Sequence, residues 1–150
     1  MKKRLISCLL AAALLLLSGC GKNTASAAEL KKLGLDPGIG NISLRILSKN
    51  SFHGDDLLKL VVKFPQDLSS VLQQDQSWHP FPMDEVTTQW VNQELGGIAS
   101  SAAQIRSGYY TLQGVNPAEP ESSLRKGHYN FIVAVYDRDL KTMYYCEVSA

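Results

Sequence analysis

Cysteine is scarce in this sequence. The 150 residues include three cysteines, Cys8, Cys20 and Cys146. The first two lie within or directly after an apolar stretch near the N-terminus, which leaves Cys146 without a partner in the rest of the chain. A scaffold held together by disulfides is therefore excluded, and the domain must rely on a hydrophobic core. A segment of roughly 110 residues is long enough to form one.

An excess of one charge sign is also missing. The sequence has 15 Lys and Arg residues against 14 Asp and Glu residues. Lys2, Lys3 and Arg4 belong to the N-terminal stretch. The rest of the chain thus has a net charge of about −2, without the clustered basic face that nucleic-acid binding requires. We expect no nucleic-acid partner.

The main apolar stretch is too short to cross a membrane. It runs from Leu5 to Leu17, and as a helix it reaches only ~20 Å, against a hydrocarbon core of ~30 Å. Three basic residues precede it, and the small residues Ser18 and Gly19 follow it. This order is typical of a secretory signal peptide.

The residues Leu17-Ser18-Gly19-Cys20 resemble the lipobox of bacterial lipoproteins, which has a leucine three positions before the cysteine and small residues between. The resemblance implies that residues 1–19 are a signal peptide that is removed, and that the sulfur of Cys20 receives a diacylglyceryl group. The protein is then anchored at the extracytoplasmic face of the cell membrane, or at the outer membrane if the cell is Gram-negative. The alternatives are an uncleaved anchor and an ordinary signal peptide with an incidental cysteine.

The lipidated cysteine is followed by a segment with little periodicity and several breakers. It ends in GLDPGIG, residues 34–40, and we interpret residues 20–40 as a flexible tether. The stretch AAELKKLGL, residues 27–35, offers a short helix packed against the domain as the alternative. The extracytoplasmic domain then comprises residues 41–150.

The pattern of the domain predicts a single small α+β fold. We expect a mainly antiparallel sheet of about five strands with two short helices, in the order ββ-αα-βββ. The strands are predicted at 43–48, 57–64, 105–113, 128–136 and 142–148, and the helices at 66–74 and 84–95.

Local signals support three of these elements. Asp84 has the character of an N-cap, and Gly96-Gly97 of a helix stop. In 57–64, Leu60 and Val62 alternate with Lys59 and Lys63, which predicts a half-buried strand. The turn DRDLK, residues 137–141, predicts a hairpin between the last two strands.

Few residues offer catalytic chemistry. In the predicted hairpin, Cys146 and His128 are separated by roughly 13 Å, so we interpret Cys146 as a buried free thiol. His53, Asp55 and Asp56 share one loop, and Asp137 and Asp139 share another, but neither loop supplies enough ligands for a dedicated metal site. We assign no catalytic residue, metal or cofactor.

Aromatic residues give the most suggestive pattern for binding. Trp78 and Phe81 lie in one loop, and Tyr109 and Tyr110 follow Gly108. Tryptophan and tyrosine are enriched at recognition surfaces, so these four residues are the candidate binding site. The alternative is that an antiparallel sheet uses them as core residues.

The domain also resembles small uncharacterised domains in proteins of clostridia and their relatives. The likeness rests on the stretches FHGDD, WHPFP, GYY and VAVYD. It implies no activity, but it favours a Gram-positive cell.

These observations lead to one main hypothesis and two alternatives. The main hypothesis is a membrane-anchored lipoprotein that serves as a binding module for an envelope protein, peptide or glycan, and not as an enzyme. The first alternative is a small envelope hydrolase or metal-dependent enzyme that uses His53, Asp55 and Asp56. The second is a structural or regulatory lipoprotein that acts only within a larger complex.

Overall fold

The computed structural model describes residues 24–36, 38–49, 56–98, 104–115 and 130–149. The helices are α2 (Thr24–Lys32), α3 (Ser69–Leu72), α4 (Glu85–Trp90) and the π-helical turn η1 (Val91–Leu95). The strands are β1 (Asn41–Lys49), β2 (Asp56–Lys63), β3 (His79–Pro80), β4 (Gly108–Gly114), β5 (Phe131–Asp137) and β6 (Thr142–Ser149). No helix within these ranges is long and apolar enough to cross a bilayer.

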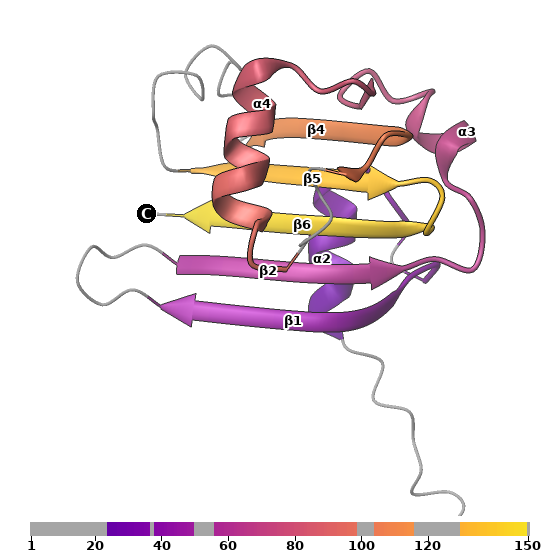
Figure 1. The fold of residues 1–150 in the computed structure, drawn as a ribbon. Coiled ribbons are helices and arrows are strands. Elements are labelled where there is room, and N and C mark those ends of the chain that lie inside the picture. The colour runs from indigo at the N-terminus through magenta and orange to yellow at the C-terminus, as the bar shows by residue number, and fades with distance from the viewer. Residues whose placement is uncertain (1–23, 37, 50–55, 99–103, 116–129, 150) are drawn as a thin grey trace, which may run out of the picture.

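The strands form one open antiparallel sheet in the order β1-β2-β6-β5-β4-β3 (Figure 1). The structure therefore confirms a single small domain built mainly on an antiparallel sheet. The number of strands is six instead of about five, because the short strand β3 pairs with β4. The helix predicted at 66–74 is reduced to the four residues of α3.

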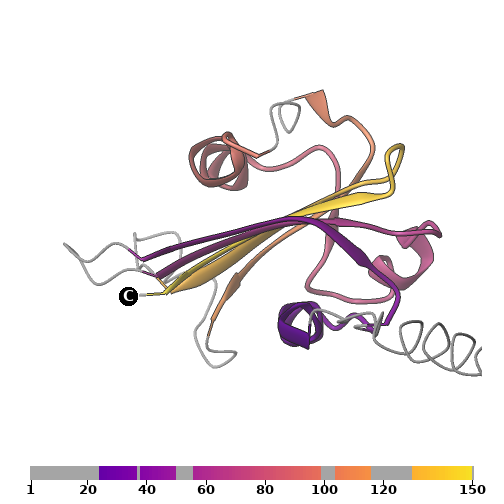
Figure 2. The same ribbon diagram turned by 90° about the horizontal axis from the view of Figure 1, so that it is seen from below.

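Helices cover both faces of the sheet (Figure 2). The helix α4 and the turn η1 lie on one face, and α2 lies on the other. Each face has its own cluster of buried apolar side chains. Every residue of β5 is buried, which is possible only because successive side chains point to opposite faces and both faces are covered.

The hairpin of β1 and β2 forms as predicted, but β2 is not half-buried. Leu60 and Val62 pack on the α2 side, and Val61 is buried on the α4 side. The Lys59 ammonium group donates a hydrogen bond to the carbonyl of Glu94 in η1. The alternation predicted correctly that Leu60 and Val62 share a buried face. It did not predict that the η1 turn covers the face on which Lys59 lies.

The hairpin of β5 and β6 is confirmed, with Asp137 opposite Thr142. One carboxylate oxygen of Asp137 accepts hydrogen bonds from the backbone of Asp139 at 2.9 Å and of Leu140 at 3.0 Å. The aspartate is thus part of the turn geometry, as short polar side chains often are.

The N-cap prediction at Asp84 is also confirmed. Its carboxylate accepts hydrogen bonds from the backbone N–H of Thr87 at 2.9 Å and from the Thr87 hydroxyl at 2.6 Å. Val91 and Leu95 then point into the core on this side of the sheet, and the Trp90 ring lies 4.5 Å from that of Phe131. The helix therefore begins at a side-chain cap and is held by its apolar stripe.

The tether interpretation of residues 20–40 is wrong from Thr24 onward. Residues Thr24–Lys32 form helix α2, which ends in a Schellman motif. The N–H of Leu35 donates to the carbonyl of Leu30 at 2.9 Å, and the N–H of Gly34 donates to that of Lys31 at 3.0 Å. Gly34 has φ of 72°, a conformation that favours glycine. Leu30 and Leu35, which flank the motif, are both buried.

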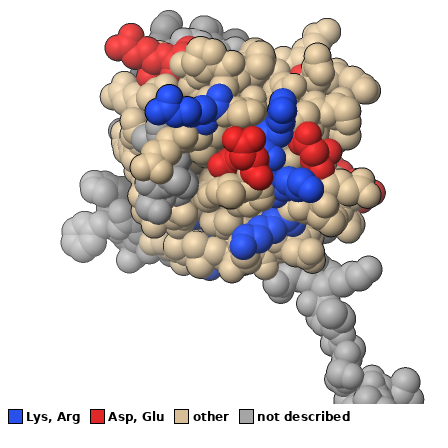
Figure 3. Space-filling model, turned by 45° about the vertical axis from the view of Figure 1, so that its right-hand side comes forward, with Lys and Arg blue, Asp and Glu red and all other residues tan. Residues whose placement is uncertain are grey.

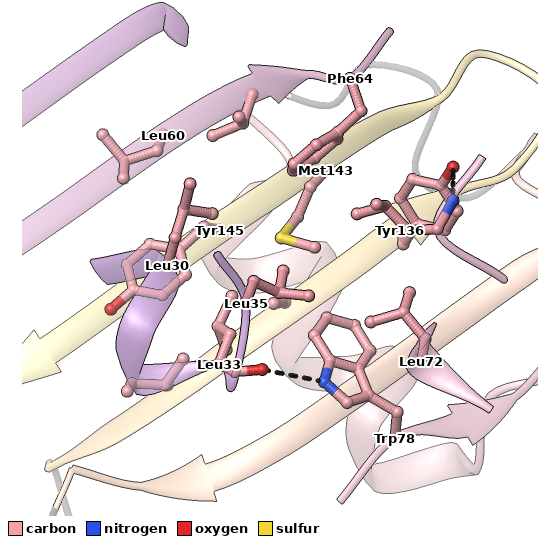
Figure 4. Close-up of a cluster of buried hydrophobic side chains, with 14 residues drawn as sticks. Leu30, Leu33, Leu35, Leu60, Phe64, Leu72, Trp78, Tyr136, Met143 and Tyr145 are labelled. Atoms are coloured by element: carbon pink, nitrogen blue, oxygen red, sulfur yellow. Dashed lines mark hydrogen bonds between the residues drawn. The ribbon is translucent and has the colours of Figure 1, made fainter. Parts of the chain in front are cut away.

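Helix α2 is attached to the sheet by apolar and polar contacts. Leu30, Leu33 and Leu35 belong to one buried cluster with Trp78, whose indole N–H donates to the Leu33 carbonyl at 3.5 Å (Figure 4). The Lys32 ammonium group lies 2.6 Å and 2.7 Å from the two carboxylate oxygens of Glu147. This helix is an integral part of the domain.

We predict that Leu33→Ala lowers the free energy of unfolding by about 2–5 kcal/mol, because it removes a buried side chain from a packed core. Lys31→Ala is the matched control, since Lys31 is exposed in α2 two positions before Leu33, and it should change stability by less than about 0.5 kcal/mol. Urea unfolding followed by tryptophan fluorescence measures both. Equal stability of Leu33→Ala and the parent protein would support the tether interpretation instead.

Candidate binding groove

Pairing of β3 with β4 brings the two predicted aromatic segments together. His79 lies opposite Tyr110, and Pro80 lies opposite Tyr109. The four residues proposed as a binding site thus come from neighbouring strands of the sheet or lie next to them. The rings of Phe81 and Tyr110 pack edge to face with their centroids 6.0 Å apart.

The aromatic side chains do not form the expected open surface. Trp78 is buried in the cluster on the α2 side, and Tyr110 is buried in the cluster on the α4 side. Phe81 and Tyr109 are partly buried and also pack against these two clusters. The alternative, that the sheet uses these aromatic residues in its core, is correct for Trp78 and Tyr110. Both faces of the sheet are covered, so side chains on either face become buried.

A groove opens beside this aromatic cluster, between the end of α2 and helix α3. It encloses about 480 Å³. Its lining residues are Leu33, Gly34, Leu35, Val71, Leu72, Gln74, Asp75 and Gln76. Leu33, Leu35 and Leu72 are almost completely buried, whereas Val71, Gln74 and Gln76 are exposed. Figure 4 shows Leu33 and Leu35 on one side of Trp78 and Leu72 on the other.

Asp75 supplies the single charged side chain among these lining residues. One of its carboxylate oxygens accepts hydrogen bonds from the backbone and the hydroxyl of Ser77, at 2.9 Å and 2.8 Å. The other oxygen faces Gly34, where an added Cβ would lie only 3.0 Å from it. Because Gly34 has no side chain, the space beside this carboxylate oxygen in the groove stays open.

The wall formed by α3 is held by a buried tyrosine of the sheet. The hydroxyl of Tyr136 accepts a hydrogen bond from the N–H of Leu68 and donates one to Asp67, both at 3.0 Å. Burial, together with the nearby carboxylate of Asp67, raises the pKa of Tyr136 to about 12. The hydroxyl therefore stays protonated and remains a donor at neutral pH.

The charged side chains on the neighbouring surface are mixed in sign. On the face shown in Figure 3, Lys and Arg side chains lie directly beside Asp and Glu side chains. That face therefore has no extended surface of one charge sign.

The prediction that Cys146 is a buried free thiol is confirmed. Cys146 lies opposite Val133 in β5. Burial, with the carboxylate of Glu94 adding to it, raises the pKa of Cys146 to about 12. Because the thiolate is the nucleophile, this thiol is unreactive at neutral pH. His128 lies outside the described residues.

The loop of the alternative enzyme hypothesis is mostly outside the described structure. His53 and Asp55 lie there, and Asp56 is exposed at the start of β2. Within the described ranges, no three His, Cys, Asp or Glu side chains are grouped so that they could hold a metal ion.

Sequence reasoning missed the groove, although one signal for it was available. Leu30, Gly34 and Leu35 have the spacing of a Schellman motif with its apolar contact. That pattern predicts a helix with one face packed on the domain. No sequence signal indicated that Asp75 would lie beside Gly34, because the two residues are far apart in the chain.

We predict that iodoacetamide leaves Cys146 unmodified in the folded protein at pH 8 and modifies it fully in urea. Alkylation requires a thiolate that the reagent can reach. Burial blocks the reagent and keeps the thiol protonated. Mass spectrometry of the peptide containing Cys146 measures the extent. Rapid modification of the folded protein would contradict the buried position of this side chain.

No protein-family model, no curated protein and no solved structure matches this chain. The N-terminal motif and the groove are therefore the two features from which a function can be argued.

Proposed function

We propose that this protein is a membrane-anchored lipoprotein whose extracytoplasmic domain binds an envelope peptide. The observation that carries the proposal is the motif Leu17-Ser18-Gly19-Cys20 directly after a basic and then apolar N-terminal stretch. Each buried CH₂ group of an acyl chain contributes about 0.8 kcal/mol, so two chains hold a protein at a bilayer where one binds reversibly. The domain is then anchored to the extracytoplasmic face of the membrane without crossing it.

The groove supports binding as the activity of the domain. Its volume of about 480 Å³ is in the range of small-ligand sites, which combine apolar walls with a few polar groups. Here Val71 is the exposed apolar side chain, while Leu33, Leu35 and Leu72 are almost completely buried, and the polar groups come from Asp75 and the two glutamines.

The chemistry of the lining residues favours a particular class of ligand. A side chain of a peptide can fill the apolar part, and the exposed glutamine amides can pair with peptide groups. The carboxylate of Asp75 favours an amino group, since it is the charged side chain among the lining residues. We therefore assign the groove to a short peptide that carries an apolar side chain next to an amine.

We predict that Cys20→Ala releases the protein from the membrane. The mature wild-type protein should begin at Cys20 and be heavier than its sequence by the mass of the acyl groups. It should also partition into the detergent phase, whereas the variant should partition into the aqueous phase. Mass spectrometry and detergent phase separation measure these properties. An unmodified sulfur at Cys20, or a leader still attached, would refute the anchoring.

We predict that Val71→Lys weakens binding of the envelope partner at least about tenfold, which corresponds to ~1.4 kcal/mol. Val71 is 48 % exposed at the groove, and a lysine there repels an amine and competes for Asp75. Leu140→Lys is the matched control, since Leu140 is 60 % exposed in the β5–β6 turn. Affinity capture from the cell's own membranes measures both variants. Equal capture by the two would exclude the groove as the binding site.

A further inference from the structure

Strand β1 forms one edge of the sheet (Figure 1) and has exposed apolar side chains. Leu44, Ile46 and Leu47 are 41 %, 39 % and 57 % exposed. They are three of the five large hydrophobic side chains that are exposed in the described part of the chain. A strand at the edge of a sheet leaves backbone groups unpaired, and with exposed apolar side chains it is a surface suited to contact with another partner.

The apolar side chains lie on both sides of the edge. Leu44 and Ile46 are opposite Val61 and Lys59 of β2, on the side of α4. Leu47 is opposite Leu58, on the side of α2. Ile46 and Leu47 lie on opposite faces because successive side chains of a strand alternate. An irregularity between Ile42 and Leu44 places these two residues on opposite faces as well, and there the Ser43 hydroxyl donates to the carbonyl of Val61 at 3.1 Å.

The charge of β1 is of one sign. The residues Asn41–Lys49 include Arg45 and Lys49 and no acidic residue. Arg45 is exposed. An edge that combines apolar and basic side chains is complementary to the interface of an anionic lipid leaflet.

Helix α2 begins at this same edge of the sheet. Its C-terminal end lies toward the opposite edge, because the carbonyl of Leu33 accepts a hydrogen bond from Trp78, next to β3. A helix of nine residues is ~13 Å long, close to three strand spacings of ~4.8 Å. The beginning of α2 is therefore on the β1 side, as Figure 1 shows.

The length of chain before α2 restricts where the domain can sit. Only Gly21, Lys22 and Asn23 separate Cys20 from Thr24. Four residue steps span at most ~14 Å even in a fully extended chain. If Cys20 carries the lipid, as proposed above, the beginning of α2 cannot be farther than that from the lipidated residue. The short connection thus holds the β1 edge near the bilayer.

We propose that the β1 edge is the surface of the domain that rests on the membrane. Leu44, Ile46 and Leu47 contact the interfacial region, and the exposed Arg45 pairs with a phosphate of an anionic lipid. This inference rests on the proposed lipidation of Cys20. It adds to that proposal a fixed orientation, with the β3 edge of the sheet pointing away from the bilayer.

The test uses the lipidated protein with one added cysteine. Leu47→Cys places a label on β1, and Gln76→Cys places one at an exposed position beside β3. Cys146 is buried and the sulfur of Cys20 carries the lipid, so only the added thiol reacts with a bimane fluorophore. Each labelled protein is reconstituted into vesicles of phosphatidylcholine and phosphatidylglycerol that contain a lipid with a nitroxide headgroup.

We expect the label at residue 47 to be quenched several-fold more strongly than the label at residue 76. The two edges of a six-stranded sheet are separated by roughly 24 Å, well beyond the contact range of a nitroxide quencher. Arg45→Glu should reduce quenching at residue 47 in vesicles with phosphatidylglycerol and leave it unchanged in vesicles of phosphatidylcholine alone.

The outcomes separate this inference from the proposed anchoring. Equal quenching at both positions, with the proteins still floating with the vesicles, would overturn the orientation and leave the anchoring intact. Failure to float would overturn the anchoring itself. A disulfide between two copies through the cysteine at residue 47, without quenching, would assign the β1 edge to strand pairing between copies and overturn the membrane contact.

Discussion

The packing of helix α2 on the sheet is the constraint on which the other features depend. Leu30, Leu33 and Leu35 cover a face that also contains Trp78 and Tyr145. Without this helix, the central strands would expose apolar side chains on one side, since every residue of β5 is buried. The ion pair of Lys32 with Glu147 adds to this packing. The Glu147 carboxylate also accepts a hydrogen bond from the Tyr145 hydroxyl at 2.6 Å.

The same contact produces the groove and sets its position. The Schellman motif ends α2 at Gly34 and turns the chain toward α3, where Leu72 and Asp75 complete the lining. The direction of α2 across the strands also decides which edge of the sheet lies nearest to Cys20. One packing interaction thus connects the proposed binding site with the proposed orientation of the domain at the membrane.

Local sequence patterns predicted the strands and turns well because they depend on neighbouring residues. The β5–β6 hairpin follows from a turn in which Asp137 binds the backbone of residues two and three positions later. The start of α4 follows from the Asp84 carboxylate in the same way. The burial of β2 on both faces did not follow, because Lys59 reaches a carbonyl in a distant segment. The expectation of an open aromatic surface was wrong for a related reason. Both faces of the sheet are covered, so Trp78 and Tyr110 are core residues.

The sequence by itself determined the composition of the domain, its single free thiol, its hairpins and the N-terminal motif from which the anchoring is proposed. Each of these depends on residues close together in the chain. Only the tertiary structure decided that residues after Thr24 form a packed helix, that Asp75 lies beside Gly34, and that β1 is the exposed edge. Those features require contacts between distant segments, and their free energy comes from burying surfaces that no local pattern brings together.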